Sequence, residues 1–265
     1  MAAPDAAALL AAYDAQLRVH VPDPLPEGIR VERDGPLLRV VGSKPKGFVL
    51  YRDLDGLDGD ALDELIARQV RVFAERGDAF EWKLHGHDLP ADLPERLTAA
   101  GLVPEATETV VIAPAAEVAV DAPLPEGVTI REVHERADLE RIARQQSAVW
   151  GGGNESWLPD ALLQERAADP DALSVFVAEA GGEVVCSAWM RFERGTQFAT
   201  FWGGATLPAW RRRGIYRGLV AHRARIAASR GFDYLEVDAL DTSRPILERL
   251  GFVPVTTTTP FVRRP

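Results

Sequence analysis

The 265-residue sequence has little of several features that define whole classes of protein. Its one cysteine, Cys186, cannot form an internal disulfide, so we expect a fold held by packing and a reducing, cytoplasmic location. No apolar run approaches the roughly 18 uninterrupted residues that a membrane span needs, so no membrane partner is expected. Residues 1–13 are apolar but short and lack a basic leader, which predicts a surface helix rather than a secretion signal.

Positive charge is also scarce, and it is unevenly distributed. The formal net charge is −10, and all of the excess lies in residues 1–121, which hold 22 acidic and 12 basic side chains against 18 of each in residues 122–265. Such a balance excludes a protein that coats nucleic acid. Residues 208–230 are the exception, with seven arginines and no acid. A local cluster of this kind favours a small anionic ligand.

A weak internal repeat divides the chain. The pattern Leu-Pro-Glu-Gly at residues 25–28 recurs at 124–127, and Arg-Gly at 76–77 and at 230–231 leads each time from a helical pattern into a strand pattern. A short helical segment and a Thr-rich strand then follow in both halves, as expected for one unit used twice. Proline and alanine are concentrated between the halves, which predicts a linker there. We therefore expect two units, residues 1–121 and 122–265.

The second unit alternates strand and helix patterns. Its hydrophobic periodicity predicts a mixed sheet with helices on both sides. The expected strands are 128–132, 174–179, 183–192, 197–206, 234–240 and 252–262, and the expected helices are 136–149, 157–168, 214–229 and 243–250.

The arginine-rich segment joins a strand to a helix through a tight loop. The free N–H groups and the dipole at a helix amino terminus attract anions. Gly214 has no Cβ, so a phosphate can approach its backbone, and the three arginines at 211–213 add charge-assisted donors. The segment suits a pyrophosphate.

At this segment the sequence resembles the GNAT acetyltransferase superfamily. The residues at 211–216, Arg-Arg-Arg-Gly-Ile-Tyr, match the first and fourth positions of that family's cofactor loop, Gln/Arg-x-x-Gly-x-Gly/Ala. Pro208 and the Leu-Gly-Phe ending at 250–252 also fit, whereas Tyr216 departs from the pattern because Gly or Ala is usual there. The resemblance implies an α+β fold, a mixed and largely antiparallel sheet flanked by helices, in two tandem GNAT units.

The resemblance also implies an activity, the direct transfer of acetyl from acetyl-CoA to the amine of a small molecule or peptide. Backbone groups of residues 204–206 would lie along the pantetheine arm, and residues 211–217 would hold the pyrophosphate. Ser243 is added to the cofactor-binding set and is also a possible donor to the departing thiolate. The full expected set is Gly204, Ala205, Thr206, Arg211, Arg212, Arg213, Gly214, Ile215, Tyr216, Arg217 and Ser243.

The acid and the base of the reaction are less well marked. Many members have a Tyr in the short helix to protonate the thiolate, and here that position is Leu247, so Thr242, Ser243, Tyr216 or a water could take its place. Candidate bases are Glu236 and Asp238, which share a strand face by alternation. Asp238 is preferred, and Glu155, in the loop before the second helix, is a third candidate. A solvated or capping carboxylate is the alternative for each of these.

The corresponding loop of the first unit contrasts with the arginine segment. Its four aspartates, Asp53, Asp55, Asp58 and Asp60, would repel a pyrophosphate, so we expect residues 1–121 to be a degenerate GNAT-like unit without a cofactor loop. No metal site is expected, because the two histidines and one acid at 85–88 are too few ligands.

Several other features have competing interpretations. Cys186 lies in an apolar strand, which favours a buried hydrophobe over a nucleophile. The glycine-rich stretch 151–154 is interpreted as a hinge or a cover for the acceptor site. Aromatic residues gather toward that side and would suit an acceptor with an apolar or aromatic part: Trp150, Trp157, Trp189, Trp202 and Phe201.

Two other functions stay open. One is a non-catalytic acyl-CoA-binding or sensing module, which Leu247 and Tyr216 favour. The other is a tandem aminoacyl transferase that uses charged transfer RNA, which the acidic first half argues against. We expect a monomer or a homodimer with a small-molecule amine as its partner.

Overall fold

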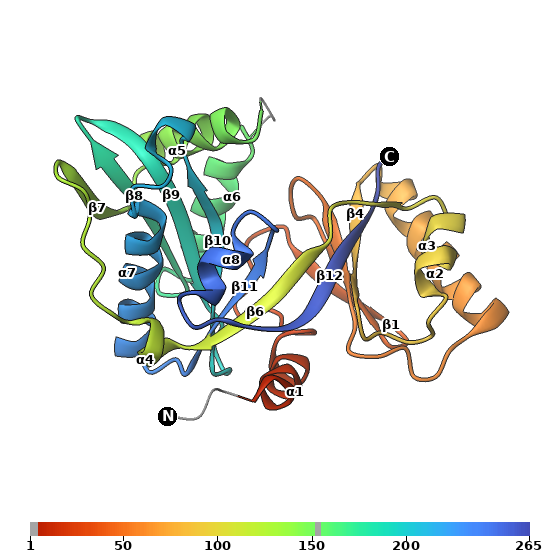
Figure 1. Ribbon diagram of the computed structural model, residues 1–265. Helices are drawn as coiled ribbons and strands as arrows, with labels where there is room; N and C mark the ends of the chain where they lie inside the picture. Colours follow the sequence, from red (N-terminus) through yellow and green to blue (C-terminus); the bar gives the residue numbers. More distant parts are fainter. Residues whose placement is uncertain (1–4, 152–154) are drawn as a thin grey trace.

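The structure is a computed structural model, which describes residues 5–151 and 155–265. It has the expected α+β fold, in which helices flank one mixed sheet (Figure 1). The first part of the chain contains the following elements: α1 (Ala6–Gln16), β1 (Arg30–Asp34), β2 (Leu37–Val41), β3 (Gly47–Leu50), α2 (Gly59–Arg76), β4 (Phe80–His85), α3 (Leu93–Ala99), β5 (Val103–Pro104), β6 (Glu108–Pro114) and α4 (Ala115–Val118).

The second part repeats much of this order. Its elements are β7 (Val128–Val133), α5 (Arg136–Val149), α6 (Leu158–Ala168), β8 (Leu173–Ala180), β9 (Glu183–Phe192), β10 (Phe198–Thr206), the 3-10 turn η1 (Pro208–Trp210), α7 (Ile215–Ser229), β11 (Tyr234–Ala239), α8 (Arg244–Glu248) and β12 (Val253–Arg263). The helix expected at 243–250 is therefore shorter than predicted.

The strands form one open sheet in the order β1-β2-β3-β4-β12-β6-β11-β10-β9-β8-β7, with β5 paired to β12. Among the described residues, only β3 with β4 and β10 with β11 run parallel. In each pair the two strands are connected by a helix, α2 in the first pair and α7 in the second. A glycine with positive φ follows shortly after each helix, Gly77 after α2 and Gly231 after α7. The two parallel pairs are the structural form of the sequence repeat.

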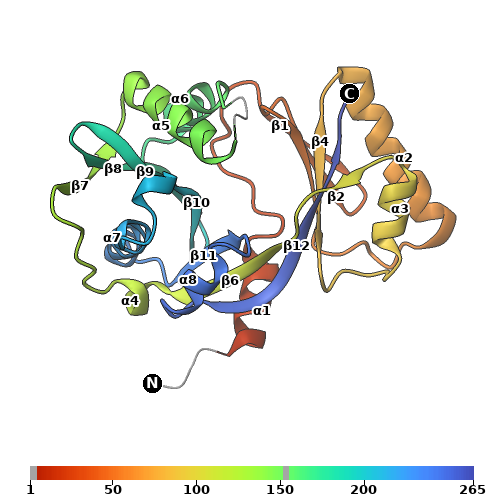
Figure 2. The ribbon, with the colours of Figure 1, turned by 45° about the horizontal axis from the view of Figure 1, so that its top comes forward.

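The last strand of each sequence half lies against the other half. Strand β6, which precedes residue 121, pairs with β11 and β12, while β12, at the end of the chain, continues onto β4. Figures 1 and 2 show β12 crossing between the two parts of the molecule. Side chains from both halves are therefore brought together at the centre of the sheet.

Helices cover both faces of the carboxy-terminal part (Figure 2). One face packs against α7 around Leu219 and Phe176, and the other packs against α5 and α6 around Ile142 and Leu162. The helix expected at the amino terminus is α1, which lies on the sheet rather than free on the surface, because Leu9 and Tyr13 are buried against β6 residues. Within residues 5–151 and 155–265, no helix combines the length and apolar character that a membrane crossing requires.

Candidate functional site

The parallel strands β10 and β11 separate toward their carboxyl ends. They pair only over residues 198–200 and 234–236. Beyond this point β10 continues beside β9 as far as Thr206, and β11 continues beside β6 as far as Ala239. The predicted residues 204–206 therefore lie on an edge of β10 that has no partner in β11, where backbone groups are available to an elongated ligand.

A β-bulge lies in the separated part of β10, between Trp202 and Ala205. Gly203 has φ of 62°, and a Cβ there would lie 1.9 Å from the Trp189 ring, so only glycine fits. Two amides from α5 hold the bulge: Gln146 Nε2 donates to Gly203 O at 2.6 Å and Gln145 Nε2 donates to Ala205 O at 3.0 Å. Neither glutamine was among the predicted site residues, although two polar residues on the inner face of a predicted helix were a usable signal.

Three of the seven arginines in the basic segment lie in the later turns of α7 or just after it, and they have structural contacts there. Arg223 is 1% exposed, donates to Trp189 O at 3.0 Å and lies 4.0 Å from the centre of the Phe201 ring. Burial without a carboxylate partner among the described residues lowers the pKa of Arg223 to about 10. Arg225 and Arg230 donate to the carbonyls of other segments. These three side chains are therefore not part of an anion site.

The other four arginines surround the start of α7. Arg211, Arg212, Arg213 and Arg217 are exposed, and none has a carboxylate within ion-pair distance in residues 5–151 and 155–265. Arg211 donates to Thr206 O at 3.1 Å, which ties the loop to the end of β10. These exposed, unpaired arginines form the predicted positive cluster.

The amino terminus of α7 has no side-chain cap. Its N-cap is Gly214, in the left-handed region with φ of 84°, and the space where a Cβ would stand is open. The first-turn N–H groups therefore lack a capping side chain and can donate to an anion, with the helix dipole favouring negative charge. Together with the four arginines, this geometry fits the pyrophosphate expected from the sequence.

The Tyr216 ring lies beside Gly204 in the bulge of β10 and reduces the space next to that strand. Its Cε2 atom would be 2.7 Å from a Cβ on Gly204, and burial raises the pKa of the Tyr216 hydroxyl. Leu247, where the resemblance expects a tyrosine, is fully buried in the core against α7. Ser243 Oγ donates to Leu240 O at 3.1 Å. Of the predicted donors to the thiolate, Tyr216 is packed and Ser243 is hydrogen-bonded, whereas Thr242 is exposed.

The predicted bases Glu236 and Asp238 point to the face of the sheet opposite α7, as alternation requires. Asp238 contacts the ammonium of Lys83, which comes from β4 in the other half. Burial, reinforced by the charge of Asp238, raises the pKa of Glu236 well above its usual range. Glu236 therefore keeps its proton at pH values where an exposed glutamate has lost it, and does not suit the role of base.

Glu155 lies just before α6, where its carbonyl accepts from Leu158 N at 3.1 Å. No hydrogen bond or ion pair within the described residues joins Glu155 to Asp238 or Glu236. The expected acceptor cover adjoining it includes residues 152–154, which lie outside the described part of the chain.

Two tryptophans on the face opposite α7 are exposed. Trp202 is 40% exposed, and its ring centre lies 4.6 Å from the Arg191 guanidinium. Trp150 is 51% exposed and donates through Nε1 to Gln146 Oε1 at 2.8 Å. Phe201, grouped with them in the sequence analysis, instead faces the core around α7. Cys186 is fully buried, which confirms its prediction as a core residue, and burial raises its pKa to about 11.

The equivalent position in the amino-terminal half is spanned by a buried network. Tyr51, after β3, donates to Asp88, after β4, and Arg18 donates to the other Asp88 oxygen at 2.6 Å. The Arg18 and Asp88 side chains are 2% and 3% exposed. Burial raises the pKa of Asp88, but the hydrogen bonds from His85 and Tyr51 and the charge of Arg18 outweigh it and lower the value to about 2.

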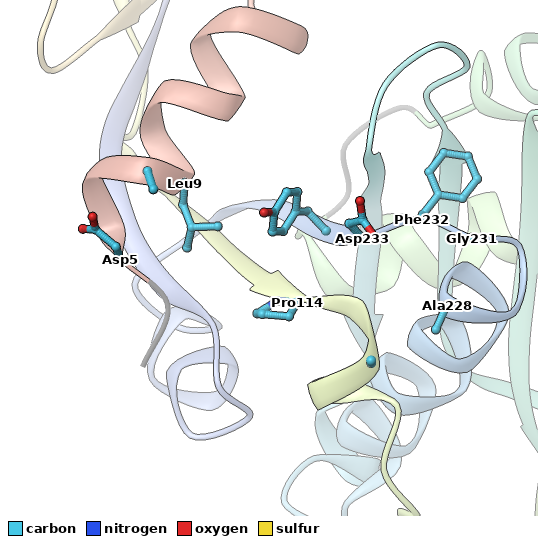
Figure 3. Close-up of a pocket in the computed structure, with 10 residues that line it drawn as sticks. Asp5, Leu9, Pro114, Ala228, Gly231, Phe232 and Asp233 are labelled. Atoms are coloured by element: carbon cyan, nitrogen blue, oxygen red, sulfur yellow. The ribbon is translucent and has the colours of Figure 1, made fainter. Parts of the chain in front are cut away.

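A pocket of about 550 Å³ lies between α1 and the turn that joins α7 to β11 (Figure 3). It adjoins Tyr234, at the amino end of β11, and so is at the opposite end of that strand from Asp238. Its lining includes the carboxylates of Asp5 and Asp233 but no lysine or arginine, so it does not suit an anionic cofactor.

Comparisons with known proteins agree with this geometry. Residues 138–252 match the model of the acetyltransferase (GNAT) family. A search of curated protein sequences gave no match. A GCN5-related N-acetyltransferase from Kribbella flavida is similar in structure, with a TM-score of 0.65, 16% identity, and coverage of 97% of this chain and 93% of that chain.

Two further solved structures share the fold. One is a GCN5-related N-acetyltransferase from Sphaerobacter thermophilus, with a TM-score of 0.62, 15% identity, and coverage of 99% of this chain and 95% of that chain. The other is a tandem GNAT protein from the clavulanic acid biosynthesis pathway, with a TM-score of 0.61, 12% identity, and coverage of 90% of this chain and 84% of that chain. The chain therefore carries a domain of the acetyltransferase (GNAT) family at residues 138–252 and has the fold of GNAT proteins, tandem members included.

Proposed function

We propose that this protein is an acetyl-CoA-dependent N-acetyltransferase with one working site, in residues 122–265. The main support is the uncapped amino terminus of α7 together with four exposed arginines that have no ion pair in the described residues, beside a strand whose backbone edge is open. We propose residues 1–121 as a degenerate GNAT-like unit, because the Arg18–Asp88–Tyr51 network spans the equivalent place. A cytoplasmic location and a monomeric or dimeric state stay predictions.

In the proposed reaction, the acceptor nitrogen attacks the thioester carbonyl carbon of acetyl-CoA. The new C–N bond forms as the C–S bond breaks, the amine proton passes to a base, and CoA leaves as a thiolate. The residues around Gly214 would hold the pyrophosphate, and backbone N–H groups on the open edge of β10 would stabilise the oxyanion. A thiol has a pKa near about 8.5, so its thiolate can leave without a dedicated acid, which is compatible with Leu247.

Binding is tested by titrating intrinsic tryptophan fluorescence with acetyl-CoA. We expect one molecule bound per chain, and at least a tenfold weaker affinity for the double variant Arg211→Glu, Arg213→Glu, because each lost charge-assisted contact costs about 1.5–3 kcal/mol. The matched control is Arg33→Glu, Arg264→Glu, which changes the charge equally at exposed positions without partners among the described residues. An equal loss in both variants, or no saturable signal in the unaltered protein, contradicts the proposed site.

A non-catalytic acyl-CoA-binding module is the second candidate, and two observations favour it. The Tyr216 ring narrows the bulge at Gly204, and Leu247 offers no proton donor. Release of CoA thiol from acetyl-CoA separates the two functions when measured with tyramine, tryptamine, cadaverine and trialanine as acceptors. Release above the rate without amine supports the enzyme, whereas binding without any amine-dependent release supports the module. The exposed rings of Trp202 and Trp150 lead us to expect the highest rate with an aromatic amine.

A further inference from the structure

The face of the sheet that carries Asp238 is built by both halves of the chain. The register places Val110 of β6 opposite Asp238, and Glu108 opposite Thr258 of β12. Thr258 also lies opposite His85 of β4. Directly opposite residues project to the same face, so the strand exchange gathers polar side chains from four strands at the carboxyl end of β11.

Two polar atoms on this face are buried without partners. Asp238 Oδ1 and Thr258 Oγ1 make no hydrogen bond within the described part of the chain, whereas His85 Nδ1 faces the Asp88 carboxylate at 3.7 Å. Buried polar atoms are nearly always hydrogen-bonded, so two unpaired atoms on one face mark a place where a polar ligand or water completes the set. Asp238 therefore offers one committed oxygen, toward Lys83, and one uncommitted oxygen.

Glu108 is the uncommitted carboxyl of this cluster. It is partly exposed, and no hydrogen bond or ion pair holds it among residues 5–151 and 155–265. The charged and titratable groups that face it are Asp238 from β11, Lys83 and Glu81 from β4 and Lys46 before β3, with His85, Tyr13 and Glu236 farther along the same face. Both lysines are already paired, Lys46 with Glu81 at 2.6 Å and Lys83 with Asp238.

This balance leaves Glu108 in both protonation states near neutral pH. Burial, followed by the negative charge of Asp238, raises the pKa of Glu108 to about 7, against the opposing effect of Lys83. A general base works best when its pKa is near the pH of operation. Asp238 is held by an ion pair and Glu236 keeps its proton, so neither of the bases predicted on β11 is as free to accept one.

We propose that Glu108, supplied by the exchanged strand of the amino-terminal half, accepts the proton of the acceptor amine. The acceptor class is a primary amine that arrives as an ammonium ion, and the negative charges of Asp238 and Glu108 attract it. The ammonium first gives one proton to the Glu108 carboxylate, which passes it to water, and the neutral amine then attacks the thioester carbon. As the C–N bond forms and the C–S bond breaks, the second nitrogen proton passes through water to the departing CoA thiolate. Lys83 is a positioning residue that fixes Asp238. This inference rests on the proposed acetyl transfer.

The test is the pH profile of acetyl transfer by Glu108→Gln, measured between pH 5.5 and 9 with the amine of the panel that reacts fastest. We expect kcat to fall about 100-fold at pH 7 and the rise of kcat/KM around pH 7 to disappear. Affinity for acetyl-CoA stays within twofold of the unaltered protein. The matched control, Glu105→Gln, removes an exposed carboxyl three residues away and leaves the profile unchanged.

The possible outcomes separate the role of Glu108 from the proposed acetyl transfer. An active unaltered protein with an unchanged Glu108→Gln profile overturns the role of Glu108 and leaves the proposed function standing. Amine-independent thiol release, or none, in the unaltered protein overturns both. For Lys83→Met we expect KM for the amine to rise at least fivefold with a smaller change in kcat, because a positioning residue acts through Asp238. A fivefold fall of kcat at unchanged KM for the amine contradicts the positioning role of Lys83.

Folding of Glu108→Gln is checked by its melting temperature. A carboxyl with a raised pKa binds more protons in the folded state between pH 4.5 and 7, so the unaltered protein loses stability as the pH rises through this range. Glutamine has no such loss. We therefore expect the variant to melt higher than the unaltered protein at pH 8 and close to it at pH 4.5. A lower melting temperature at pH 8 contradicts the unpaired placement of Glu108.

Discussion

Single carboxyl groups in this protein differ in protonation because their neighbours differ. Asp88 accepts hydrogen bonds from Tyr51, from Arg18 and from the backbone of His85, and these hold it ionised despite burial. Glu108 instead faces the negative charges of Asp238 and Glu81 and has no donor within the described residues. The first arrangement stabilises the fold, whereas the second leaves a group free to exchange protons.

Asp88 should make the free energy of unfolding depend on pH in the acid range. Its pKa is lowered from 3.8 to about 2, so its contribution is present above pH 3.8 and is lost as the pH falls toward about 2. The size of that contribution is on the order of 2 kcal/mol. In urea unfolding, the free energy of unfolding of the unaltered protein should fall across this range. That of Asp88→Asn should start lower and fall less steeply, because other carboxyls with a lowered pKa, such as Asp34 and Asp138, still titrate. Parallel curves for the two proteins would contradict this assignment.

Residue-level predictions from the sequence succeeded where they depended on local geometry. Alternation along one strand was enough to place Glu236 and Asp238 on a common face. The partner of Asp238 could not be predicted, because Lys83 is 155 positions away in sequence and contacts Asp238 only through the strand exchange. Glu108 was missed for the same reason, since it lies in the half that appeared to have lost its site.

At the scale of elements, the bulge of β10 is held from both faces of the sheet. Gln145 and Gln146 reach it from α5, while Arg223 of α7 donates to the Trp189 carbonyl on the neighbouring strand. Ser187 Oγ joins the two glutamines, as it donates to Gln145 Oε1 at 2.6 Å and accepts from Gln146 Nε2 at 2.7 Å. The open edge of β10 is therefore fixed before any ligand arrives, which limits the ordering cost of binding.

Gly203→Ala should show how tightly the bulge is packed. The added methyl would lie 1.9 Å from the Trp189 ring at a backbone φ of 62°, so the ring or the strand must move. Gly195→Ala is the control, because its φ of 76° is similar but no atom lies within 4 Å of the added carbon. We expect the Gly203 variant to lose about 1–3 kcal/mol more than the control in urea unfolding. Equal losses would mean that backbone strain alone decides the effect.

Periodicity predicted most element positions in the second half. The helix at 136–149 and the strand at 183–192 have the predicted bounds, because both have clear apolar spacing and end at glycines or turns. The bulge itself was beyond prediction, since two glycines in a strand do not specify which carbonyls turn toward which helix. The depth of α1 was also missed, because its contacts lie with β6 and β12, far away in sequence.

On the scale of the whole molecule, the two halves cannot be separated without opening the sheet. Strand β6 fills the position between β11 and β12, and cutting the chain at residue 121 removes it. The edge of β11, whose backbone groups pair with β6 over six residues, would then be exposed. Exposed strand edges favour aggregation and local unfolding. A sequence division at residue 121 thus describes the repeat but not a unit that is complete in space.

Two fragments that differ only in residues 106–121, which hold β6 and α4, test the point. Residues 106–265 keep β6 and α4 with the carboxy-terminal half, and residues 122–265 do not, while both lack β4 and so share the loss of the β12 partner. We expect the longer fragment to be soluble and to unfold in one cooperative urea transition, and the shorter one to aggregate or unfold without cooperativity. If both unfold at the same urea concentration, β12 must pair directly with β11 in the shorter fragment. Strand β6 would then be dispensable for the fold. Its position between β11 and β12 would instead serve the site, because β6 brings side chains such as Glu108 to the face of Asp238.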